Sequence, residues 1–239
     1  MKNLCLIIPC FNEEMNILGV INEVHAAVPE ACVLVINDCS SDSTSEMARK
    51  SRFAKVIDLP CNLGVGGAVQ TGFMFARRMN FSYAIKIDGD GQHDPAEVVS
   101  LMQKLDDEKA DVVIGSRFLE ETDGFKSSLM RRVGIRFFEI LCWVLVGTKI
   151  TDATSGFRAY NRKAIEFMAD HYPSFDYPEP EEIILARKNG LRVVEVSVKM
   201  RPRKYGVSSI SSAISIYYML KVSLAMLFTF LRKPLPRKN

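Results

Sequence analysis

Short apolar runs alternate with helical hydrophobic patterns along the first 115 residues of the chain. Strands of a parallel sheet buried on both faces read as near-continuous apolar runs, whereas a helix packed on a sheet repeats its apolar positions every three or four residues. This alternation predicts an α/β domain with a mostly parallel central sheet and helices on both faces. The predicted strands are Leu4–Pro9, Cys32–Asn37, Ala54–Leu59, Tyr83–Asp88 and Asp111–Gly115, and the predicted helices lie near 14–28, 43–51, 66–79 and 95–108.

The second half of the chain has a less regular pattern. Residues 128–147 predict a helix with an apolar body and a basic start. Residues 151–158 predict a loop that enters a strand. A short helix is predicted near 180–189, and a further strand over Leu191–Val198.

An apolar stretch over 213–231 is interrupted near its middle by Lys221. A membrane-spanning helix needs about 20 predominantly apolar residues, and a central lysine costs about 2.5–3.5 kcal/mol to insert. We expect a helix that lies on a membrane or docks on a membrane partner; a spanning helix and a plainly buried helix are the alternatives, and the lack of a clean polar face counts against a simple interfacial helix. Residues 1–209 are expected to form one domain, and 210–239 a membrane-proximal helix and tail.

Charge is unevenly distributed along the chain. No acidic residue follows Glu195, and nine of the 31 basic residues lie in 199–239. Residues 1–198 therefore carry 22 basic against 28 acidic side chains, a net charge of about −6. A basic end on an acidic body indicates an anionic partner, either nucleic acid or an anionic membrane surface.

The six cysteines form neither a CxxC pair nor a zinc-like cluster, and several lie in apolar runs, where a free thiol behaves as a small hydrophobic group. With no signal peptide at the amino terminus, a reducing cytoplasmic location is expected. The three histidines lie far apart and only His93 is near a motif, so we do not expect a histidine-based metal site.

The candidate chemistry begins where the fourth predicted strand ends, in Asp88-Gly89-Asp90. In an extended segment residues i and i+2 project to the same side, so the two carboxylates can converge. Mg²⁺ and Mn²⁺ prefer carboxylate oxygen, and Mg²⁺ is often held by one or two carboxylates plus substrate phosphates. The motif therefore indicates a metal site that receives a nucleotide diphosphate, and a surface turn rich in Asp and Gly is the plain alternative.

Polar, chain-turning segments also follow the first three predicted strands, at 9–13, 37–42 and 61–64. Ligands of parallel sheets bind beyond the carboxyl ends of the strands. We therefore expect these segments and the Asp88/Asp90 pair to cluster along one edge of the sheet and to form a site.

Seven short motifs follow one another along roughly residues 3–210, each weak alone but specific in their joint order. They are Ile8 to Glu14, Asn37 to Thr44, Asn62-Leu63-Gly64 with Gly66 and Gly67, Asp88 to His93, Gly115-Ser116-Arg117, Ser155 to Arg158, and Arg201 to Ser209. In this order they resemble the family 2 glycosyltransferases of the GT-A fold. Among these, the chain is most similar to the dolichol- and polyprenyl-phosphate mannose or glucose synthases. The resemblance implies a Rossmann-like, mostly parallel sheet flanked by helices.

The resemblance also implies residues for a nucleotide sugar and its metal. Asp88 and Asp90 would hold Mg²⁺ or Mn²⁺, with Gln92 as a further ligand, and the cation would stabilise charge on the departing nucleoside diphosphate. Asn37 and Cys39 replace the first Asp and the Gly of the usual Asp-Asp-Gly-Ser, which leaves the choice of nucleotide open. The expected donor-binding residues are Pro9, Phe11, Glu13, Asp38, Gly64, Asp88 and Gly89.

In this family the acceptor is a lipid phosphate monoester. Its second pKa is around 6, so near pH 7 it needs positive charge for binding and alignment, and no strong base. An arginine can clamp a phosphate through two N–H groups, and a helix start is partly positive. The expected acceptor-phosphate residues are Arg117, Arg131, Arg201, Arg203 and Ser208. The alternatives are a salt bridge from Arg117 to Glu120 or Glu121, and a solvated basic turn at 201–204.

The acidic cluster Glu179/Glu181/Glu182 lies where many members of the family place a catalytic carboxylate. The alignment is loose in this region, and Asp152 is likewise either a turn residue or a site residue. The expected catalytic residues are Asp88, Asp90, Arg117 and Glu181.

Two other motifs have competing interpretations. Asp38 and Asp42 both precede the predicted helix 43–51, where Asp is a preferred capping residue. We expect Asp42 to cap this helix and Asp38 to bind the nucleotide. The run Gly64-x-Gly66-Gly67 resembles a dinucleotide-binding loop, but position 69 is Val69, so close backbone packing near the donor is the better interpretation.

The sequence thus predicts an inverting, metal-dependent glycosyltransferase that moves one hexose or N-acetylhexosamine from a UDP- or GDP-sugar to polyprenyl phosphate at the cytoplasmic face of a membrane. Two rivals stay open: a family 2 transferase that elongates a polysaccharide, and a catalytically silent, membrane-associated subunit that binds nucleotide sugars. The expected partners are the donor, the lipid acceptor and a membrane surface or small membrane protein. A homo-oligomer is an open possibility, and nucleic acid is not expected.

Overall fold

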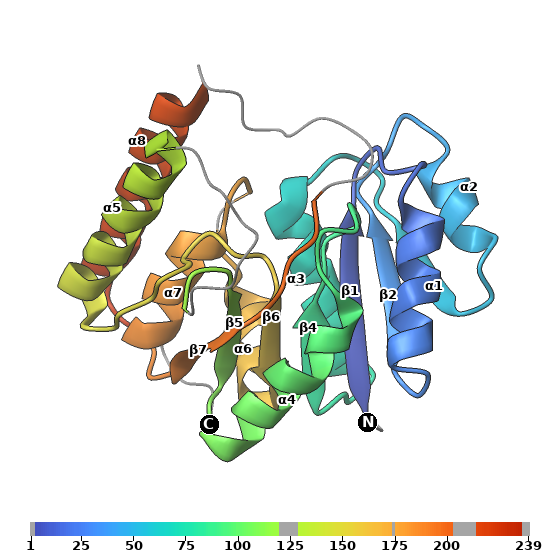
Figure 1. Cartoon of the computed structure of the whole chain (residues 1–239), viewed down its shortest axis with the longest axis horizontal. Coiled ribbons are helices and arrows are strands. Elements are labelled where there is room, and N and C mark those ends of the chain that lie inside the picture. Colours follow the sequence, from blue (N-terminus) through green and yellow to red (C-terminus); the bar gives the residue numbers. More distant parts are fainter. Residues whose placement is uncertain (1–2, 120–128, 174, 203–213, 236–239) are drawn as a thin grey trace.

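The computed structural model describes residues 3–119, 129–173, 175–202 and 214–235. Its centre is a seven-stranded sheet in the order β3-β2-β1-β4-β6-β5-β7 (Figure 1). β6 runs antiparallel to its neighbours β4 and β5, and the other paired strands run parallel. The strands are β1 (Leu4–Cys10), β2 (Cys32–Asn37), β3 (Ala54–Asp58), β4 (Tyr83–Lys86), β5 (Val112–Ser116), β6 (Arg158–Asn161) and β7 (Val193–Ser197).

The predicted mostly parallel α/β architecture is therefore confirmed. The five strands predicted in the first 115 residues all form, with small differences at their ends. β4 ends at Lys86, two residues earlier than predicted, so Asp88 and Asp90 lie in the loop that follows. The hydrophobic pattern predicts no helix directly after β6, where the structure has α6 (Arg162–His171). Its start is marked by Asn161, whose side chain accepts a hydrogen bond from the backbone N–H of Ala164.

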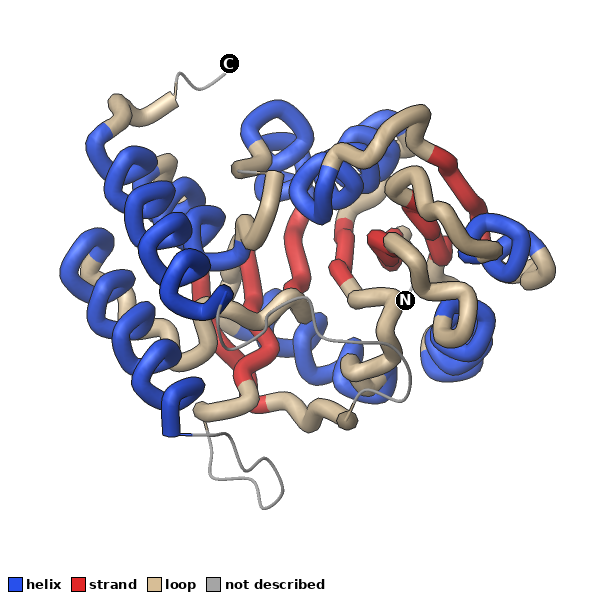
Figure 2. Tube along the Cα trace, turned by 90° about the horizontal axis from the view of Figure 1, so that it is seen from above, coloured by secondary structure: helices blue, strands red, loops and turns tan. Residues whose placement is uncertain are grey.

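Helices cover both faces of the sheet, as Figure 2 shows from above. Side chains alternate between the two faces along a strand. In β1, Ile7 packs with the layer of α3, α6 and α7, whereas Leu6 and Ile8 pack with α1, α2 and α4. These helices are α1 (Ile17–Ala27), α2 (Thr44–Arg49), α3 (Gly64–Arg78), α4 (Val98–Asp107) after the short turn η1 (Pro95–Glu97), and α7 (Glu179–Lys188).

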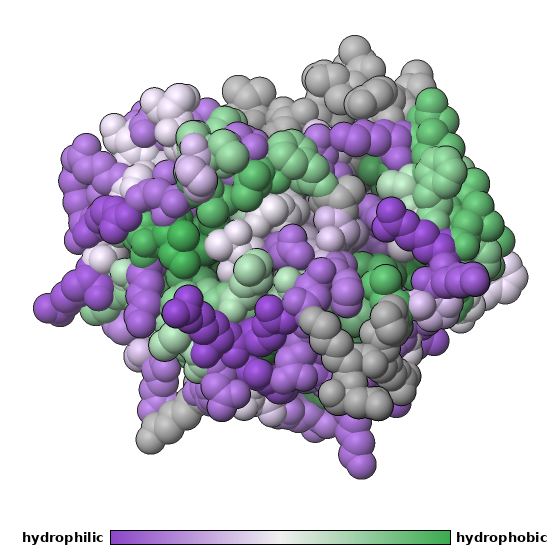
Figure 3. Space-filling view, turned by 180° about the vertical axis from the view of Figure 1, so that it is seen from behind, coloured by the Kyte–Doolittle hydropathy of each residue, from purple (hydrophilic) through white to green (hydrophobic). Residues whose placement is uncertain are grey.

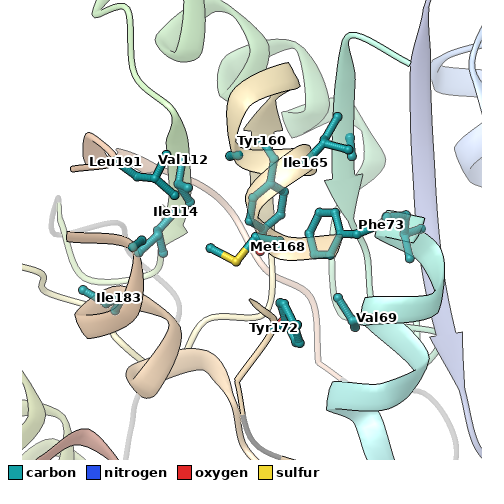
Figure 4. Close-up of a cluster of buried hydrophobic side chains, with 14 of the residues drawn as sticks. Val69, Phe73, Val112, Ile114, Tyr160, Ile165, Met168, Tyr172, Ile183 and Leu191 are labelled. Carbon is teal, nitrogen blue, oxygen red and sulfur yellow. The ribbon is translucent and has the colours of Figure 1, made fainter. Parts of the chain in front are cut away.

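The larger of the two cores joins the middle of the sheet to α3, α6 and α7 (Figure 4). Phe73 of α3 meets the ring of Tyr160 of β6 edge-on, with ring centroids 4.7 Å apart. Burial of one such large apolar side chain contributes about 1.5–3 kcal/mol. This packing makes the sheet a rigid base for the loops at its carboxyl edge.

Two long helices, α5 (Leu129–Val146) and α8 (Ile214–Leu231), lie side by side outside α7 (Figure 1). Phe138 of α5 and Met226 of α8 are buried in the larger core. Lys221 interrupts the apolar surface of α8 and forms an ion pair with Asp176, with 2.9 Å between Nζ and Oδ2. No helix in the described part of the chain is both long enough and apolar enough to cross a membrane.

Candidate active site

The carboxyl ends of β3, β2, β1 and β4 lie next to one another at one edge of the sheet. Backbone hydrogen bonds continue past the strand ends, from Ile87 N–H to Ile7 O at 3.0 Å and from Asp38 N–H to Cys10 O at 2.9 Å. Leu59 N–H likewise donates to Asn37 O at 2.9 Å. The prediction that the polar segments after these strands cluster along one edge is therefore confirmed.

Asp88-Gly89-Asp90 lies against the end of β1. A Cβ at Gly89 would lie 2.6 Å from Cys10 Sγ and 3.3 Å from Pro9 O, so only glycine allows this close approach. Asp90 Oδ1 accepts a hydrogen bond from the backbone N–H of Gln92 at 3.0 Å, which fixes the turn after the motif.

Four carboxylates act electrostatically on the buried thiol of Cys10. Burial raises the pKa of this thiol well above its ordinary value, and the negative charges of Glu13, Asp88, Asp90 and Asp42 raise it further. These acidic groups come from the loops after β1, β2 and β4, and repulsion between them favours a bound cation. The negative charge of the site is thus built by tertiary structure around the Asp88/Asp90 pair.

His93 contacts Asp88, the first residue of the carboxylate pair, at two points. Its Nδ1 accepts a hydrogen bond from the backbone N–H of Asp88 at 3.1 Å, and its Nε2 lies 3.6 Å from Asp88 Oδ2. The ring stacks on Phe157 with centroids 4.8 Å apart, and burial lowers its pKa. A neutral imidazole that carries its proton on Nε2 fits both contacts, so the ring orients Asp88.

The ligand set fits a divalent metal that arrives with its substrate. Within the described residues, no group of three or more His, Cys, Asp or Glu side chains is arranged to enclose a metal ion. Mg²⁺ in nucleotide-dependent enzymes is commonly held by one or two carboxylates, with substrate phosphates and water as the other ligands. Asp88 and Asp90, amid the surrounding acidic groups, match that incomplete set.

The expected donor pocket is built by the loops after β1, β2 and β3. Asp38 is buried, which raises its pKa, and its Oδ1 accepts a hydrogen bond from Leu63 N–H at 2.7 Å directly before α3. Phe11 is 49% exposed at the same edge and is available to stack on a ligand. Asp42 accepts from the backbone N–H of Thr44, the first residue of α2, but the N-cap position of this helix is occupied by Ser43, so the helix begins one residue later than the predicted cap at Asp42 requires.

Arg117 follows β5 and faces Asp152. Its Nε and one terminal nitrogen lie 2.6 Å and 2.7 Å from the two oxygens of Asp152, and the same terminal nitrogen donates to Thr154 Oγ1 at 3.0 Å. A Cβ on Gly156, four residues after Asp152, would lie 2.7 Å from Asp88 Oδ2, so the loop that carries Asp152 reaches the Asp88 side of the site. The alternative partners Glu120 and Glu121 lie outside the described residues.

Comparison of the sequence with models of protein families identifies the family of this chain. The family model described as "Glycosyl transferase family 2" matches residues 5–168, which is more than half of the chain and includes the loops after β1 to β5. The chain belongs to glycosyl transferase family 2. It is a glycosyltransferase, and its homologues are hexosyltransferases of the polyprenyl-phosphate sugar synthase type.

Relatives of this glycosyltransferase extend over most of its length. It is 31% identical to the polyprenol monophosphomannose synthase of Mycolicibacterium smegmatis, over 91% of this chain and 84% of that protein. It is 27% identical to the UDP-N-acetylglucosamine–dolichyl-phosphate N-acetylglucosaminyltransferase of Methanococcus voltae, over 92% and 95%. Among solved structures, glucosyl-3-phosphoglycerate synthase of Mycobacterium tuberculosis, in complex with Mn²⁺, UDP and phosphoglyceric acid, has a TM-score of 0.73. The identity is 19%, and 98% of this chain and 80% of that chain are covered, so this likeness establishes the GT-A fold.

In this glycosyltransferase, Arg201 lies beside the loop that follows β4 and carries Asp88 and Asp90. Its backbone N–H donates to Gln92 O at 2.8 Å, and Met200 forms a β-bridge with His93. Its guanidinium pairs with Glu23 of α1 and with Asp94, so its charge is shared with two carboxylates. The phosphate-binding role assigned to Arg201 stays a prediction. Arg203, Ser208 and the side chain of Arg131 lie outside the described residues.

The acidic residues at the start of α7 contact two different parts of the protein. Glu181 Oε1 accepts from Thr229 Oγ1 of α8 at 2.6 Å, so this side chain joins two helices, and its predicted catalytic role stays a prediction. Glu179 instead pairs with Lys86, two residues before Asp88. The sequence motifs assigned no role to Lys86, although a lysine inside the apolar run of β4 indicates that an acidic partner is buried beside it.

Proposed function

We propose that this glycosyltransferase transfers a single hexose or N-acetylhexosamine from a UDP- or GDP-sugar to polyprenyl phosphate, with inversion at the anomeric carbon. The observation that carries the proposal is the arrangement at the sheet edge. Asp88 and Asp90 follow β4, and the loop over Thr151–Phe157, whose Asp152 pairs with Arg117, reaches Asp88 through Gly156. The carboxylate pair suits a metal-bound diphosphate, and the arginine suits a phosphate acceptor. The names of the relatives from Mycolicibacterium smegmatis and Methanococcus voltae support the same reading.

On the donor side, Asp88 and Asp90 would hold the divalent cation, which supplies positive charge to the departing nucleoside diphosphate. Phe11 offers an exposed ring for the base, and Asp38 fixes the loop before α3 beside it. His93 keeps Asp88 oriented through its backbone N–H. These residues bind and align the donor, and the leaving group keeps the pair of electrons from the broken glycosidic bond.

On the acceptor side, the attacking group is a phosphate oxygen that is already ionised near pH 7. It forms the new bond to the anomeric carbon as the bond to the diphosphate breaks, so no protein base has to remove a proton. Arg117 holds a permanent positive charge close to the metal side, and its pairing with Asp152 fixes the plane of the guanidinium. That charge would attract and align the acceptor phosphate.

We further propose that the outer face of α5 and α8 rests on a lipid bilayer. Figure 3 shows hydrophobic residues gathered along the edge of the molecule where these helices lie. Trp143 and Phe228 are 61% and 63% exposed there. Such a contiguous apolar face marks an interaction site. The other exposed apolar residues of this face are Phe137, Ile140, Val144, Leu220, Leu224, Leu227 and Leu231.

The charges around this face favour a membrane over a protein partner. The side chains of Arg136 and Lys149 are 75% and 72% exposed near α5, and Arg232 and Lys233 are exposed at the end of α8. α8 contains no acidic residue. Basic residues that border an apolar helical face are the pattern of helices bound to anionic lipid surfaces.

A donor panel tests the proposed reaction. The purified protein is incubated with each UDP- and GDP-sugar, Mn²⁺ or Mg²⁺, and a short polyprenyl phosphate, and lipid-linked sugar is measured. We expect one donor to give product, and Asp90→Ala to reduce the rate on the order of 10²-fold or more, the size of effect seen when one charge-stabilising group is removed. Asp107→Asn, an exposed acidic residue of α4, is the control. Transfer only to a growing glycan, or undiminished activity of Asp90→Ala, would overturn the proposal.

A further inference from the structure

The loop over Thr151–Phe157 connects the partner of Arg117 to the surroundings of Asp88, and it is held by a buried carboxylate. Glu195 of β7 is 9% exposed. Its Oε2 accepts from the backbone N–H of Thr151 at 2.7 Å, and its Oε1 accepts from the backbone N–H of Asp152 at 2.9 Å. The hydroxyl of Thr151 lies 3.1 Å from both oxygens. One side chain therefore satisfies the first two N–H groups of the loop.

A buried cation holds the same loop from the opposite side. Arg158 of β6 has no exposed surface, and it donates to the backbone carbonyls of Ser155 at 2.8 Å and Ala153 at 3.0 Å. Its remaining terminal nitrogen lies 3.2 Å from Glu182 of α7, which is also buried. The loop is thus fixed through its N–H groups by a negative charge and through its carbonyl groups by a positive charge.

The loop touches the proposed site at both of its ends. At the first end, Asp152 forms the two-point contact with Arg117. At the second, a Cβ on Gly156 would lie 2.7 Å from Asp88 Oδ2, and Phe157 stacks on His93. A shift of the loop would therefore move both Arg117, the proposed acceptor-side cation, and Asp88, the proposed metal ligand.

Stability alone gives no reason for this arrangement. A buried ion costs free energy through lost hydration, and well-packed apolar residues of similar volume often stabilise a fold as well or better. What a carboxylate adds at position 195 is geometry, because it accepts from two neighbouring N–H groups at once and so sets the backbone of Thr151 and Asp152. Asp152 in turn sets the plane of Arg117.

We propose that Glu195 is a positioning residue for sugar transfer, which acts through the backbone of Thr151–Asp152 on the guanidinium of Arg117. The inference rests on the proposed role of Arg117 at the acceptor phosphate. Glu195 itself contacts neither proposed substrate. Glu195 affects the reaction by placing the Arg117 guanidinium. The effect of a substitution at Glu195 therefore depends on which side chain is present at position 117.

A double-mutant cycle measures that dependence. Glu195→Gln keeps the shape but places an amide NH₂ against an N–H donor of the loop. In the wild-type background we expect kcat to fall about 10–100-fold, the range for loss of a partner that orients a site residue, with a higher KM for polyprenyl phosphate. The Kd of the nucleoside diphosphate with Mn²⁺ changes less than about threefold. In an Arg117→Lys background the same substitution costs less than about threefold, since coupled residues are non-additive. Equal losses in both backgrounds would refute the inference.

A direct readout separates this inference from the proposed acceptor. The Arg117 Nε–H donates to Asp152, so its NMR signal, assigned by its absence in Arg117→Lys, is expected to exchange slowly in the wild-type protein. We expect Glu195→Gln to lose that protection and Glu108→Gln, an acidic residue of a surface ion pair, to keep it. If the wild type does not use polyprenyl phosphate, the proposed acceptor fails, and this signal still decides the role of Glu195. If Glu195→Gln is poorly folded, Glu195→Asp, which shortens the reach of the carboxylate to the two loop N–H groups, replaces it with the same readout; a protected signal in either folded variant contradicts the inference.

Discussion

Lys86 and Glu179 form an ion pair between the end of β4 and the start of α7, two residues before Asp88. The lysine has no exposed surface, and its antiparallel neighbour in the sheet is Arg158, a second buried cation. Two like charges on facing positions destabilise a sheet, so the acidic start of α7 is needed to balance them. Glu179 balances Lys86, and Glu182 of the same helix, which is buried and lies 3.2 Å from Arg158, balances the second cation.

Loss of the glutamate is therefore expected to weaken the fold. Glu179→Ala leaves Lys86 buried without its partner, and removal of one member of a buried pair costs about 3–5 kcal/mol of unfolding free energy. Urea unfolding monitored by circular dichroism gives the value. The double variant Lys86→Met/Glu179→Leu should recover most of the loss, because it removes both charges. A double variant as unstable as the single one would contradict this explanation.

Gly156 is predicted to be intolerant of even one methyl group. Alanine at this position would place its Cβ 2.7 Å from Asp88 Oδ2, closer than van der Waals contact allows, so the carboxylate must move. We expect Gly156→Ala to raise the Mn²⁺ concentration needed for half-maximal activity about tenfold or more, because misplacement of a reacting group by about 1 Å is costly. Activity is measured across a Mn²⁺ titration.

The matched control is Gly19→Ala in α1, where a Cβ would meet nothing within 4 Å. Alanine within a helix is favoured over glycine, so this variant should keep its metal response and gain about 0.5–1 kcal/mol of stability. A normal metal response in Gly156→Ala would mean that the backbone relaxes around the methyl group and that Asp88 is not confined by this loop.

The apolar face of α5 and α8 predicts binding to anionic vesicles. Trp143→Ser/Phe228→Ser removes two large exposed side chains, and each apolar side chain buried in a lipid surface contributes about 1.5–3 kcal/mol. We expect binding to vesicles of phosphatidylglycerol, measured by co-sedimentation, to fall by at least about tenfold. Soluble-phase thermal stability should change little, because both side chains are exposed.

Met74→Ser/Met79→Ser is the control for this surface, since both methionines are about half exposed away from α5 and α8. If the control lowers vesicle binding as much as Trp143→Ser/Phe228→Ser does, binding is a property of general hydrophobicity. If the wild-type protein does not bind vesicles, the proposed contact with lipid is wrong, and the face covers a protein partner or a second copy of the chain.

Asp111 should make the stability depend on acid pH. Burial alone would raise its pKa, but hydrogen bonds from Lys163, from the backbone N–H of Arg192 and from Asn161 outweigh that effect and lower the pKa. A carboxyl group with a lowered folded-state pKa stabilises the fold above its unfolded pKa, and that contribution is lost as the pH falls through the folded value. The wild type should lose unfolding free energy below about pH 4, the region of an ordinary Asp pKa. In urea titrations Asp111→Asn should lose less over the same range, and parallel curves for the two proteins would refute the assignment.

The sequence by itself determined the alternating architecture and predicted the chemistry of the site. Near-continuous apolar strands marked the parallel core, because a strand buried on both faces cannot alternate with polar residues. The Asp88-Gly89-Asp90 motif and the segments after β1, β2 and β3 were predicted to meet at one edge, because parallel strands share one carboxyl edge. The helical segment around Lys221 was likewise evident from composition.

Tertiary structure decided which charged residues face each other. The partners of Arg117, Lys86 and Glu195 lie 35 to 93 positions away in the chain, and no local pattern encodes such pairings. The same holds for the acidic cluster at the start of α7, where Glu179 faces Lys86 and Glu181 faces α8 although only two positions separate them. Local propensity is set by neighbours in sequence, whereas the direction of a charged side chain is set by whichever distant partner compensates its burial. The sequence therefore predicted a carboxylate site for a nucleotide sugar, and only the fold showed which buried ions hold the loops around that site.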